Sequence, residues 1–182
     1  MSARELTRIS FDEGLQLFQH SSLEELKTKA NEIRQIKNPG NLITFVVDTN
    51  PNYTNVCTAD CLFCAFYRKP GQTGGYTLTV EEVMSKIEQS LKWGVTTVLL
   101  QGGLHPDLKM DFYVRLVSET RKRFKGITPH FFSAPEIYNR AEVNQLSIRE
   151  VLQLLWDAGQ RTLPGGGAEI LSESVRKKYH PK

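Results

Sequence analysis

The chain has few cysteines and lacks any long apolar run. Only three of its 182 residues are cysteines, and all lie between residues 57 and 64. An odd number packed this closely cannot form a set of long-range disulfides, which favours a reducing compartment and a metal role. No apolar stretch approaches the roughly 20 residues of a membrane helix, and residues 1–10 lack the apolar core of a secretion signal. We therefore predict a soluble, cytoplasmic protein without a membrane partner.

The chain also lacks a strong charge of either sign. Lysine and arginine total 23, against 20 aspartate and glutamate residues, and the basic residues do not gather on one stripe. The one dense basic run, at residues 121–125, is expected to cap a helix dipole and face water. This composition predicts one globular domain over residues 1–182, with a buried core and no nucleic-acid partner.

Residues 1–41 are predicted to form a helical preface to the main fold. Ser10 and Glu13 make a capping-box pattern ahead of a short apolar helix, and a second helix begins near Ser22. Apolar residues recur at helical spacing in this second segment until residues 38–40, Asn-Pro-Gly, stop it.

From residue 42 on, strand and helix patterns alternate. Runs of β-branched and aromatic residues predict strands at residues 42–48, 95–100 and 128–133, with a strand-like stub at 161–163. Helix patterns cover residues 79–94, 111–124 and 147–159, a loop is expected at 134–145, and the chain ends in a polar helical segment.

This alternation predicts an α/β fold with a parallel sheet built from right-handed βαβ units. With about four such units, residues 42–182 are expected to be the N-terminal part of a (β/α) TIM-type barrel, because a complete barrel takes ~250 residues. We therefore interpret the chain as a truncated barrel domain.

The strongest chemical signal is Cys57-Thr-Ala-Asp-Cys61-Leu-Phe-Cys64. The array follows the first predicted strand directly, and barrel active sites lie at that carboxyl-terminal edge of the strands. A cubane cluster has four irons, so three thiolates leave one iron open to another ligand. We predict that Cys57, Cys61 and Cys64 hold a [4Fe-4S] cluster with one open iron.

Two other kinds of site also use cysteine ligands. A structural zinc site needs a fourth ligand, and the four histidines all lie outside the cysteine loop, at spacings unlike a zinc knuckle or finger. A ferredoxin-type electron carrier needs four cysteines for each cubane. Both alternatives are weaker than the open cluster.

The cysteine spacing, with aromatic Phe63 just before the third cysteine, resembles the radical S-adenosylmethionine (SAM) signature. In that superfamily the methionine amino and carboxylate groups of the cosubstrate chelate the open iron. A reduced cluster then cleaves the cosubstrate to methionine and a 5′-deoxyadenosyl radical. The resemblance implies two cofactors, a [4Fe-4S] cluster and S-adenosyl-L-methionine, and an electron donor such as flavodoxin or ferredoxin.

Five segments in order resemble the cyclic dehypoxanthinyl futalosine synthases of menaquinone biosynthesis, from about Ser10 to the last residue. They are Asn52-Tyr-Thr-Asn-Val-Cys57, Phe63-Cys-Ala-Phe-Tyr-Arg68, Gln101-Gly-Gly-Leu-His-Pro106, His130-Phe-Phe-Ser-Ala-Pro-Glu-Ile137 and Leu163-Pro-Gly-Gly-Gly-Ala-Glu-Ile170. Full members of that family continue into the second half of a barrel. The resemblance implies a radical SAM oxidoreductase that cyclises the small molecule dehypoxanthine futalosine.

Two alternatives to that function stay open. Sister radical SAM enzymes, such as aminofutalosine synthase and the deazaflavin-forming synthases, share the cysteine loop and the Gln-Gly-Gly segment. The chain could also be a non-catalytic fragment that binds a cluster or a partner, because its strand pattern stops midway through a barrel.

The resemblance also implies cofactor contacts beyond the cysteines. Gly102 and Gly103 follow the second predicted strand, and without side chains they would let backbone groups approach a ligand. The resemblance implies that they hold the methionine amine, and a tight turn is the alternative. Ser133 and Glu136 follow the third strand and would face the cosubstrate, with Glu136 near its ammonium or a ribose hydroxyl. Pro135 makes this stretch equally readable as a strand-ending turn.

Further residues near these motifs are candidates for ligand contacts or for structural roles. Phe63 and Tyr67 would cover the cluster or stack on adenine, unless they only pack, and Arg68 would help to hold an anionic ligand. His105 is either a proton carrier near neutral pH or part of a structural hydrogen bond. The glycines at 165–167 would approach ribose or substrate. No catalytic acid or base is assigned.

Overall fold

A computed structural model describes residues 8–166 and 170–179 of the chain. It divides into two compact units, Met1–Phe45 and Val46–Lys182. Among the described residues, no helix combines the length and the apolar character that crossing a membrane requires.

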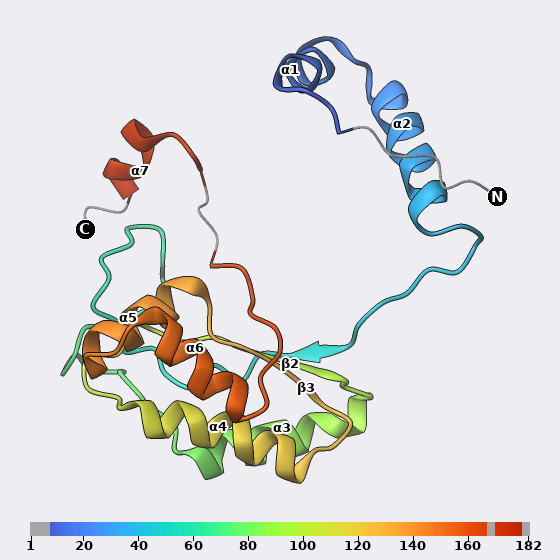
Figure 1. Ribbon diagram of the computed structural model, residues 1–182. Helices are drawn as coiled ribbons and strands as arrows, with labels where there is room; N and C mark the ends of the chain where they lie inside the picture. Colours follow the sequence, from blue (N-terminus) through green and yellow to red (C-terminus); the bar gives the residue numbers. More distant parts are fainter. Residues whose placement is uncertain (1–7, 167–169, 180–182) are drawn as a thin grey trace. The chain divides into compact units, whose positions relative to one another are not determined.

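The first unit contains two helices, α1 (Phe11–His20) and α2 (Leu23–Lys37), both visible in Figure 1. Each begins with a capping box, which was predicted for the first of them. The side chain of Ser10 accepts the backbone N–H of Glu13, and the carboxylate of Glu13 accepts the N–H of Ser10. Ser22 and Glu25 repeat this arrangement at the start of α2. The two helices predicted in this part of the chain are confirmed.

The second unit is built around a parallel sheet with the strand order β1-β2-β3 among the described residues. The strands are β1 (Asp48–Thr49), β2 (Thr97–Leu100) and β3 (Thr128–Phe131). Asp48 pairs with Thr97, and Leu100 pairs with Phe131. Helix α3 (Val80–Ser90) with the short 3-10 helix η1 (Leu91–Trp93) joins β1 to β2, and α4 (Met110–Arg123) joins β2 to β3. Parallel strands joined by helices are the predicted βαβ units.

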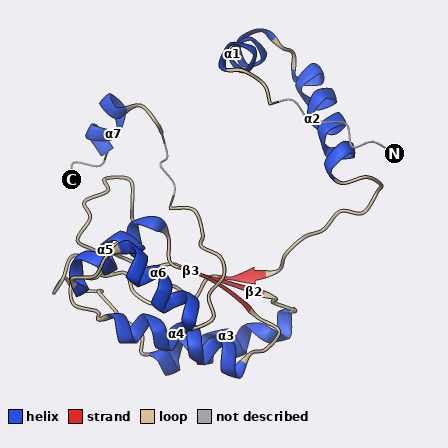
Figure 2. Cartoon of the chain, viewed as in Figure 1, coloured by secondary structure: helices blue, strands red, loops and turns tan. Residues whose placement is uncertain are grey.

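The two faces of this sheet differ in polarity. Val98, Leu100 and Phe131 are fully buried and pack with the apolar side chains of α3 and α4, which lie along one side of the strands in Figure 2. Because successive side chains of a strand point to opposite faces, Thr97 and His130 lie on the other face, which is open. The core therefore lies between the sheet and the helices.

The first predicted strand is wrong for most of residues 42–48. Only Asp48–Thr49 form a strand, while the side chains of Leu42, Ile43 and Phe45 are exposed. A β-branched and aromatic run is suited to a strand, but a strand forms only beside a partner. The pairing of β1 with β2 begins at Asp48 opposite Thr97, and just before it the Val47 carbonyl accepts the Thr96 N–H at 3.0 Å.

The loop predicted at residues 134–145 is also wrong, because a helix, α5 (Ala134–Asn144), occupies it. Ser133 and Glu136 are its capping box, and Pro135 lies in its first turn. Proline is tolerated there because a backbone N–H at that position has no acceptor within the helix. Gln145 ends the helix in the left-handed region, at φ 55°.

The predicted fourth strand is present only as a single parallel bridge between His130 and Thr162. Before it comes α6 (Ile148–Asp157), with a capping box at Ser147, and after it the short helix α7 (Glu173–Tyr179). The described part of this unit is thus a small parallel sheet with helices, the arrangement of part of a TIM-type barrel.

Removal of the Ser147 hydroxyl tests the cap of α6. The hydroxyl accepts the backbone N–H of Glu150 at 3.2 Å. The substitution Ser147→Ala is expected to lower the free energy of unfolding by about 1 kcal/mol, measured by urea denaturation. Ser118→Ala is the matched control, because Ser118 lies within α4 and the change there should be close to neutral. Equal losses in the two variants would contradict the capping role.

The same cap should respond to pH. Hydrogen bonds from Ser147 lower the pKa of Glu150 below its ordinary value of 4.5. A carboxylate whose folded pKa is depressed stabilises the fold above the unfolded pKa, and this stabilisation is lost as pH falls through the folded value. We expect the difference between the wild-type chain and Ser147→Ala to shrink as pH falls below 4.5, measured by urea unfolding across a pH series.

Candidate cluster and cosubstrate site

The three cysteines lie on the long loop between β1 and α3. Cys57 is buried, and Cys61 and Cys64 are half-buried. Cys57 and Cys64 open onto one hollow at the carboxyl-terminal ends of β2 and β3, which we call the cluster-side hollow. Its lining residues are Asn52, Cys57, Cys64, Phe66, Tyr67, Gln101, Gly102, Gly103, Ser133, Glu136, Gly165 and Gly166.

The loop is held at its base by hydrogen bonds around Asn55 and Cys57. The Asn55 side chain donates to the Gly74 carbonyl at 3.0 Å and accepts the Tyr76 N–H at 2.8 Å. The N–H of Cys57 donates to the Arg68 carbonyl at 2.9 Å. These bonds join the two sides of the loop and therefore restrain the backbone around Cys57. We call this part of the loop the braced segment.

Gly102 and Gly103 lie directly against this braced segment. A Cβ atom on Gly102 would lie 2.7 Å from the Tyr53 ring, and one on Gly103 would overlap the Val56 carbonyl oxygen and lie 2.9 Å from the Cys57 Cβ. Glycine is therefore required here by the close approach of the cysteine loop. The contact with the methionine amine stays a prediction.

The next residue of this turn contacts the cysteine itself. The N–H of Leu104 donates to Cys57 Sγ at 3.2 Å. Hydrogen bonds to cluster sulfurs are one of the means by which a protein sets a cluster's reduction potential. The end of β2 thus contributes to the environment of the proposed iron ligand.

The donor set fits an iron–sulfur cluster by its chemistry. Burial, followed by the neighbouring Cys57 and Cys64 thiols, raises the pKa of Cys61. Within the described part of the chain, no three Cys, His, Asp or Glu side chains gather closely enough to hold a metal ion. A cubane cluster binds each thiolate to a different iron, so it does not require the three sulfurs to gather around one point. No described histidine lines the cluster-side hollow, so no imidazole there can be a fourth zinc ligand.

Glu136 lies at the floor of the cluster-side hollow and accepts four hydrogen bonds. Its Oε1 accepts from the Tyr53 hydroxyl at 2.7 Å and from the Gly102 N–H at 3.1 Å. Its Oε2 accepts from the N–H of Ser133 at 2.8 Å and from the Ser133 hydroxyl at 2.7 Å. Burial raises the pKa of Glu136, although the hydrogen bonds from Ser133 and Tyr53 oppose the shift. The structure thus gives both predicted residues a structural role, and their contact with the cosubstrate stays a prediction.

Of the other aromatic and basic residues predicted to contact a ligand, only Tyr67 lines the cluster-side hollow. Tyr67 lines the cluster-side hollow, whereas Phe63 is 52% exposed and is not part of that lining. The Arg68 guanidinium donates to the carbonyls of Ala65 at 3.2 Å and Tyr67 at 2.8 Å, within its own loop. The roles predicted for Phe63 and Arg68 toward a ligand stay predictions.

His105 makes the structural hydrogen bond that was one of its two predicted roles. Its Nδ1 accepts the Asp107 N–H at 3.1 Å, so the neutral ring carries its proton on Nε2. Burial lowers the pKa of His105, which favours this neutral form.

Of the three glycines at 165–167, the first two line the cluster-side hollow, and Gly167 lies outside the described residues. A Cβ on Gly166 would overlap the Pro135 ring, whereas one on Gly165 would meet open space. Close packing against α5 therefore accounts for Gly166.

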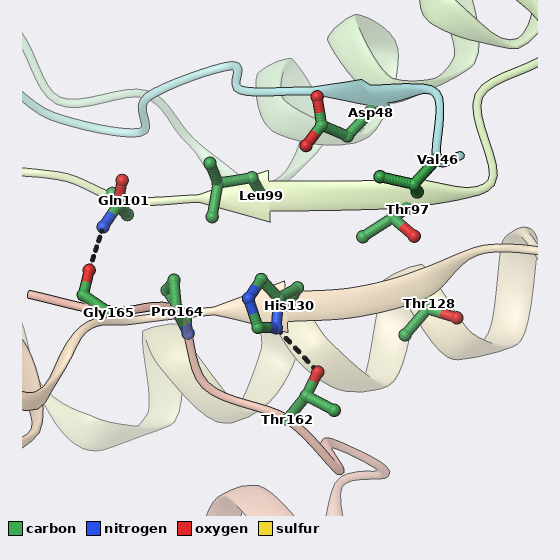
Figure 3. A pocket seen from close by; sticks show the side chains of 10 residues that line it. All are labelled: Val46, Asp48, Thr97, Leu99, Gln101, Thr128, His130, Thr162, Pro164 and Gly165. Atoms are coloured by element: carbon green, nitrogen blue, oxygen red, sulfur yellow. Dashed lines mark hydrogen bonds between the residues drawn. The ribbon is translucent and has the colours of Figure 1, made fainter. Parts of the chain in front are cut away.

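A second hollow lies on the open face of the sheet, and we call it the sheet-face hollow (Figure 3). Its lining residues are Val46, Asp48, Thr97, Leu99, Gln101, Thr128, His130, Thr162, Pro164 and Gly165. His130 Nδ1 and the Thr162 hydroxyl share a hydrogen bond of 2.8 Å. Gln101 and Gly165 line both hollows, and the Gln101 amide donates to the Gly165 carbonyl at 3.2 Å. The two hollows therefore adjoin at this hydrogen bond.

Two buried residues of the site were not identified from the sequence. Tyr53 and Arg140 contact one another beneath the cluster-side hollow, where Arg140 Nη2 donates to the Tyr53 hydroxyl at 2.6 Å. Arg140 was missed because α5 was expected to be a loop. The pattern Ser133-Ala-Pro-Glu136 is itself a helix-start signature and would have revealed the helix. No local pattern singles out Tyr53.

Comparison with curated proteins finds enzymes that are similar in sequence to this chain. A cyclic dehypoxanthine futalosine synthase from Halalkalibacterium halodurans is 42% identical over 169 residues, which are 93% of this chain and 46% of that protein. An aminodeoxyfutalosine synthase from Thermus thermophilus is 37% identical over 171 residues, 94% of this chain and 46% of that protein. The chain thus spans about half the length of these relatives.

A solved structure has a similar fold, and one superfamily matches most of the chain. HydG, a maturase of the [FeFe]-hydrogenase, has a similar fold with a TM-score of 0.68 at 17% identity, over 96% of this chain and 37% of that chain. The sequence pattern of the radical SAM superfamily, whose members are enzymes that bind a [4Fe-4S] cluster and S-adenosylmethionine, matches residues 51–182. Because that match covers more than half of the chain and includes all three cysteines, the chain belongs to the radical SAM superfamily.

Proposed function

We propose that this chain is the cluster-binding part, about four βα units long, of a TIM-type barrel enzyme that cyclises dehypoxanthine futalosine. The observation that carries the proposal is the meeting of the cysteine loop, the Gly102–Gly103 turn and Glu136 in one hollow at the carboxyl ends of parallel strands. The 42% identity to a cyclic dehypoxanthine futalosine synthase supports this choice of reaction.

In this proposal the cysteine loop and the residues of the cluster-side hollow have separate roles. Cys57, Cys61 and Cys64 would hold the cluster, and the Gly102–Gly103 turn would receive the methionine amine. When bound, a reduced cluster supplies the electron that cleaves the cosubstrate to methionine and a 5′-deoxyadenosyl radical. The protein residues around it orient this pair and shield it from solvent.

The sheet-face hollow is the place we assign to the substrate. It adjoins the cluster-side hollow at Gln101 and Gly165, so a molecule bound there would lie next to the cosubstrate. Its hydroxyl, imidazole and carboxylate side chains, from Thr97, His130 and Asp48 among others, suit a polar molecule that carries hydroxyl groups.

Product analysis tests the reaction directly. The chain is reconstituted anaerobically with iron and sulfide, reduced with dithionite in place of the proposed flavodoxin or ferredoxin, and given S-adenosylmethionine with dehypoxanthine futalosine. We expect 5′-deoxyadenosine and a product that lacks two hydrogens of the substrate, identified by mass spectrometry. Omission of S-adenosylmethionine should abolish both.

Two outcomes would overturn the assignment. Turnover only with the substrate of aminofutalosine synthase would assign the chain to that sister enzyme, to which it is also similar. A cluster that forms but yields no 5′-deoxyadenosine would favour the non-catalytic fragment.

A further inference from the structure

Three segments that are distant in sequence converge on the Glu136 carboxylate. Tyr53 lies on the cysteine loop ahead of Cys57, Gly102 follows β2, and Ser133 is the N-cap of α5. Each of them donates a hydrogen bond to this carboxylate. Glu136 itself is only 1% exposed. A buried carboxylate is tolerated only when donors and an opposite charge compensate for its lost hydration. A buried positive charge is therefore expected near the Glu136 carboxylate.

The compensating charge is Arg140, and the Tyr53 hydroxyl connects it to Glu136. Arg140 is 1% exposed and lies one helical turn after Glu136 on α5. The Tyr53 hydroxyl accepts from Arg140 Nη2 at 2.6 Å and donates to Glu136 Oε1 at 2.7 Å. Removal of this hydroxyl would leave both buried charges short of a partner.

The same tyrosine also limits where Gly102 can lie. Its ring packs so closely against Gly102 that an added Cβ would lie 2.7 Å from ring carbons. The Glu136 carboxylate holds the Gly102 N–H at 3.1 Å, and the next residue, Gly103, lies against the Cys57 segment. The turn is therefore confined by the ring, the carboxylate and the cysteine loop together.

We propose that Tyr53 and Arg140 are positioning residues, which hold the Glu136 carboxylate against the Gly102 N–H and thereby fix the Gly102–Gly103 turn for binding of S-adenosylmethionine. This inference rests on the proposed cosubstrate site and is independent of the substrate. Neither residue touches the cosubstrate in this proposal, because both lie beneath the cluster-side hollow and do not line it.

A matched pair of tyrosines in the chain allows a clean test. Tyr53 and Tyr113 are both fully buried, and their rings pack edge to face with centroids 5.8 Å apart. The Tyr53 hydroxyl makes hydrogen bonds to Glu136 and Arg140, whereas among the described residues the Tyr113 hydroxyl makes none to either charged group. Tyr53→Phe and Tyr113→Phe therefore remove the same atom from neighbouring sites, and only the first removal breaks hydrogen bonds to the charged pair.

The first measurement is cosubstrate affinity of the reconstituted chain, by equilibrium dialysis of radiolabelled S-adenosylmethionine. We expect Tyr53→Phe to bind S-adenosylmethionine about tenfold more weakly, with unchanged iron content, because the lost hydrogen bonds involve charged partners. Tyr113→Phe should bind it as the wild-type chain does. Unchanged affinity in Tyr53→Phe, or equal losses in both variants, would overturn the proposal.

The second measurement uses the metal-free chain and does not depend on any cofactor. Hydrogen–deuterium exchange at the amides of residues 101–104 should be faster in Tyr53→Phe than in the wild-type chain and in Tyr113→Phe. If exchange in this segment is unchanged, Tyr53 does not fix the turn. If exchange is faster while the wild-type chain binds no S-adenosylmethionine, the proposed cosubstrate site itself has failed.

A second variant covers the case in which Tyr53→Phe does not fold. Arg140→Lys keeps a positive charge in the core but replaces the guanidinium that donates to Tyr53 at 2.6 Å. A folded Arg140→Lys chain should show the same weaker binding and the same faster exchange at residues 101–104. Wild-type values for both would overturn the proposal.

Discussion

Replacement of Cys57, Cys61 or Cys64 by alanine is expected to reduce the iron of the reconstituted chain to background and to abolish formation of 5′-deoxyadenosine. These are the only cysteines in the sequence, so no other thiol can take the place of a lost one. A cubane with only two thiolates has two irons without a protein ligand, and such a cluster is not retained. Iron content and the electron paramagnetic resonance spectrum of the reduced protein measure the effect.

The control for these variants lies within the same loop. Leu62 stands between Cys61 and Cys64 and is 68% exposed, so Leu62→Ala should retain the cluster. A cysteine variant with full iron content would show that its thiol is not a ligand. Stoichiometric zinc in the wild-type chain, without a cubane signal, would instead support the structural zinc site.

Replacement of Gly103 by alanine is expected to displace Cys57 and lower the free energy of unfolding by about 1–3 kcal/mol. The added methyl would overlap the Val56 carbonyl oxygen and lie 2.9 Å from the Cys57 Cβ, and these atoms are braced by the hydrogen bond between Cys57 N–H and the Arg68 carbonyl. Backbone atoms cannot give way as a flexible side chain can. Urea unfolding and iron content after reconstitution measure the two effects.

Gly126→Ala is the control for this substitution. A Cβ at Gly126 would have no heavy atom within 4 Å, so this variant should change the free energy of unfolding by less than about 0.5 kcal/mol. A Gly103→Ala chain as stable as Gly126→Ala, with wild-type iron content, would show that the cysteine loop adapts and that Gly103 is not required by packing.

Helices whose ends carry local signals were predictable from the sequence. The capping boxes at Ser10, Ser22, Thr79 and Ser147 mark the starts of α1, α2, α3 and α6, and each is present in the structure. A capping box needs only two residues three positions apart, so a short stretch of sequence is enough to identify it. Helix α5 carries the same signal, which was missed because its serine and glutamate were interpreted as ligand contacts.

Strands were harder to predict, because pairing depends on distant residues. Residues 42–48 have the composition of a buried strand, yet only the last of them belongs to β1. Composition indicates that a segment suits a sheet, and it cannot say where the neighbouring strand begins. The alternation of the later strands with helices did predict the parallel order, because β2 and β3 each follow a helix of clear periodicity.

The sequence by itself determined the candidate iron ligands, because three cysteines within one short loop restrict the chemistry whatever the fold. Only the tertiary structure decided what surrounds them. The hydrogen bond from Tyr53 to Glu136 joins residues 83 positions apart, and the contact of Gly103 with Cys57 joins two loops on different strands. Such contacts arise when the ends of parallel strands come together at one edge of a sheet. A pattern of neighbouring residues cannot predict which distant residues will be in contact there.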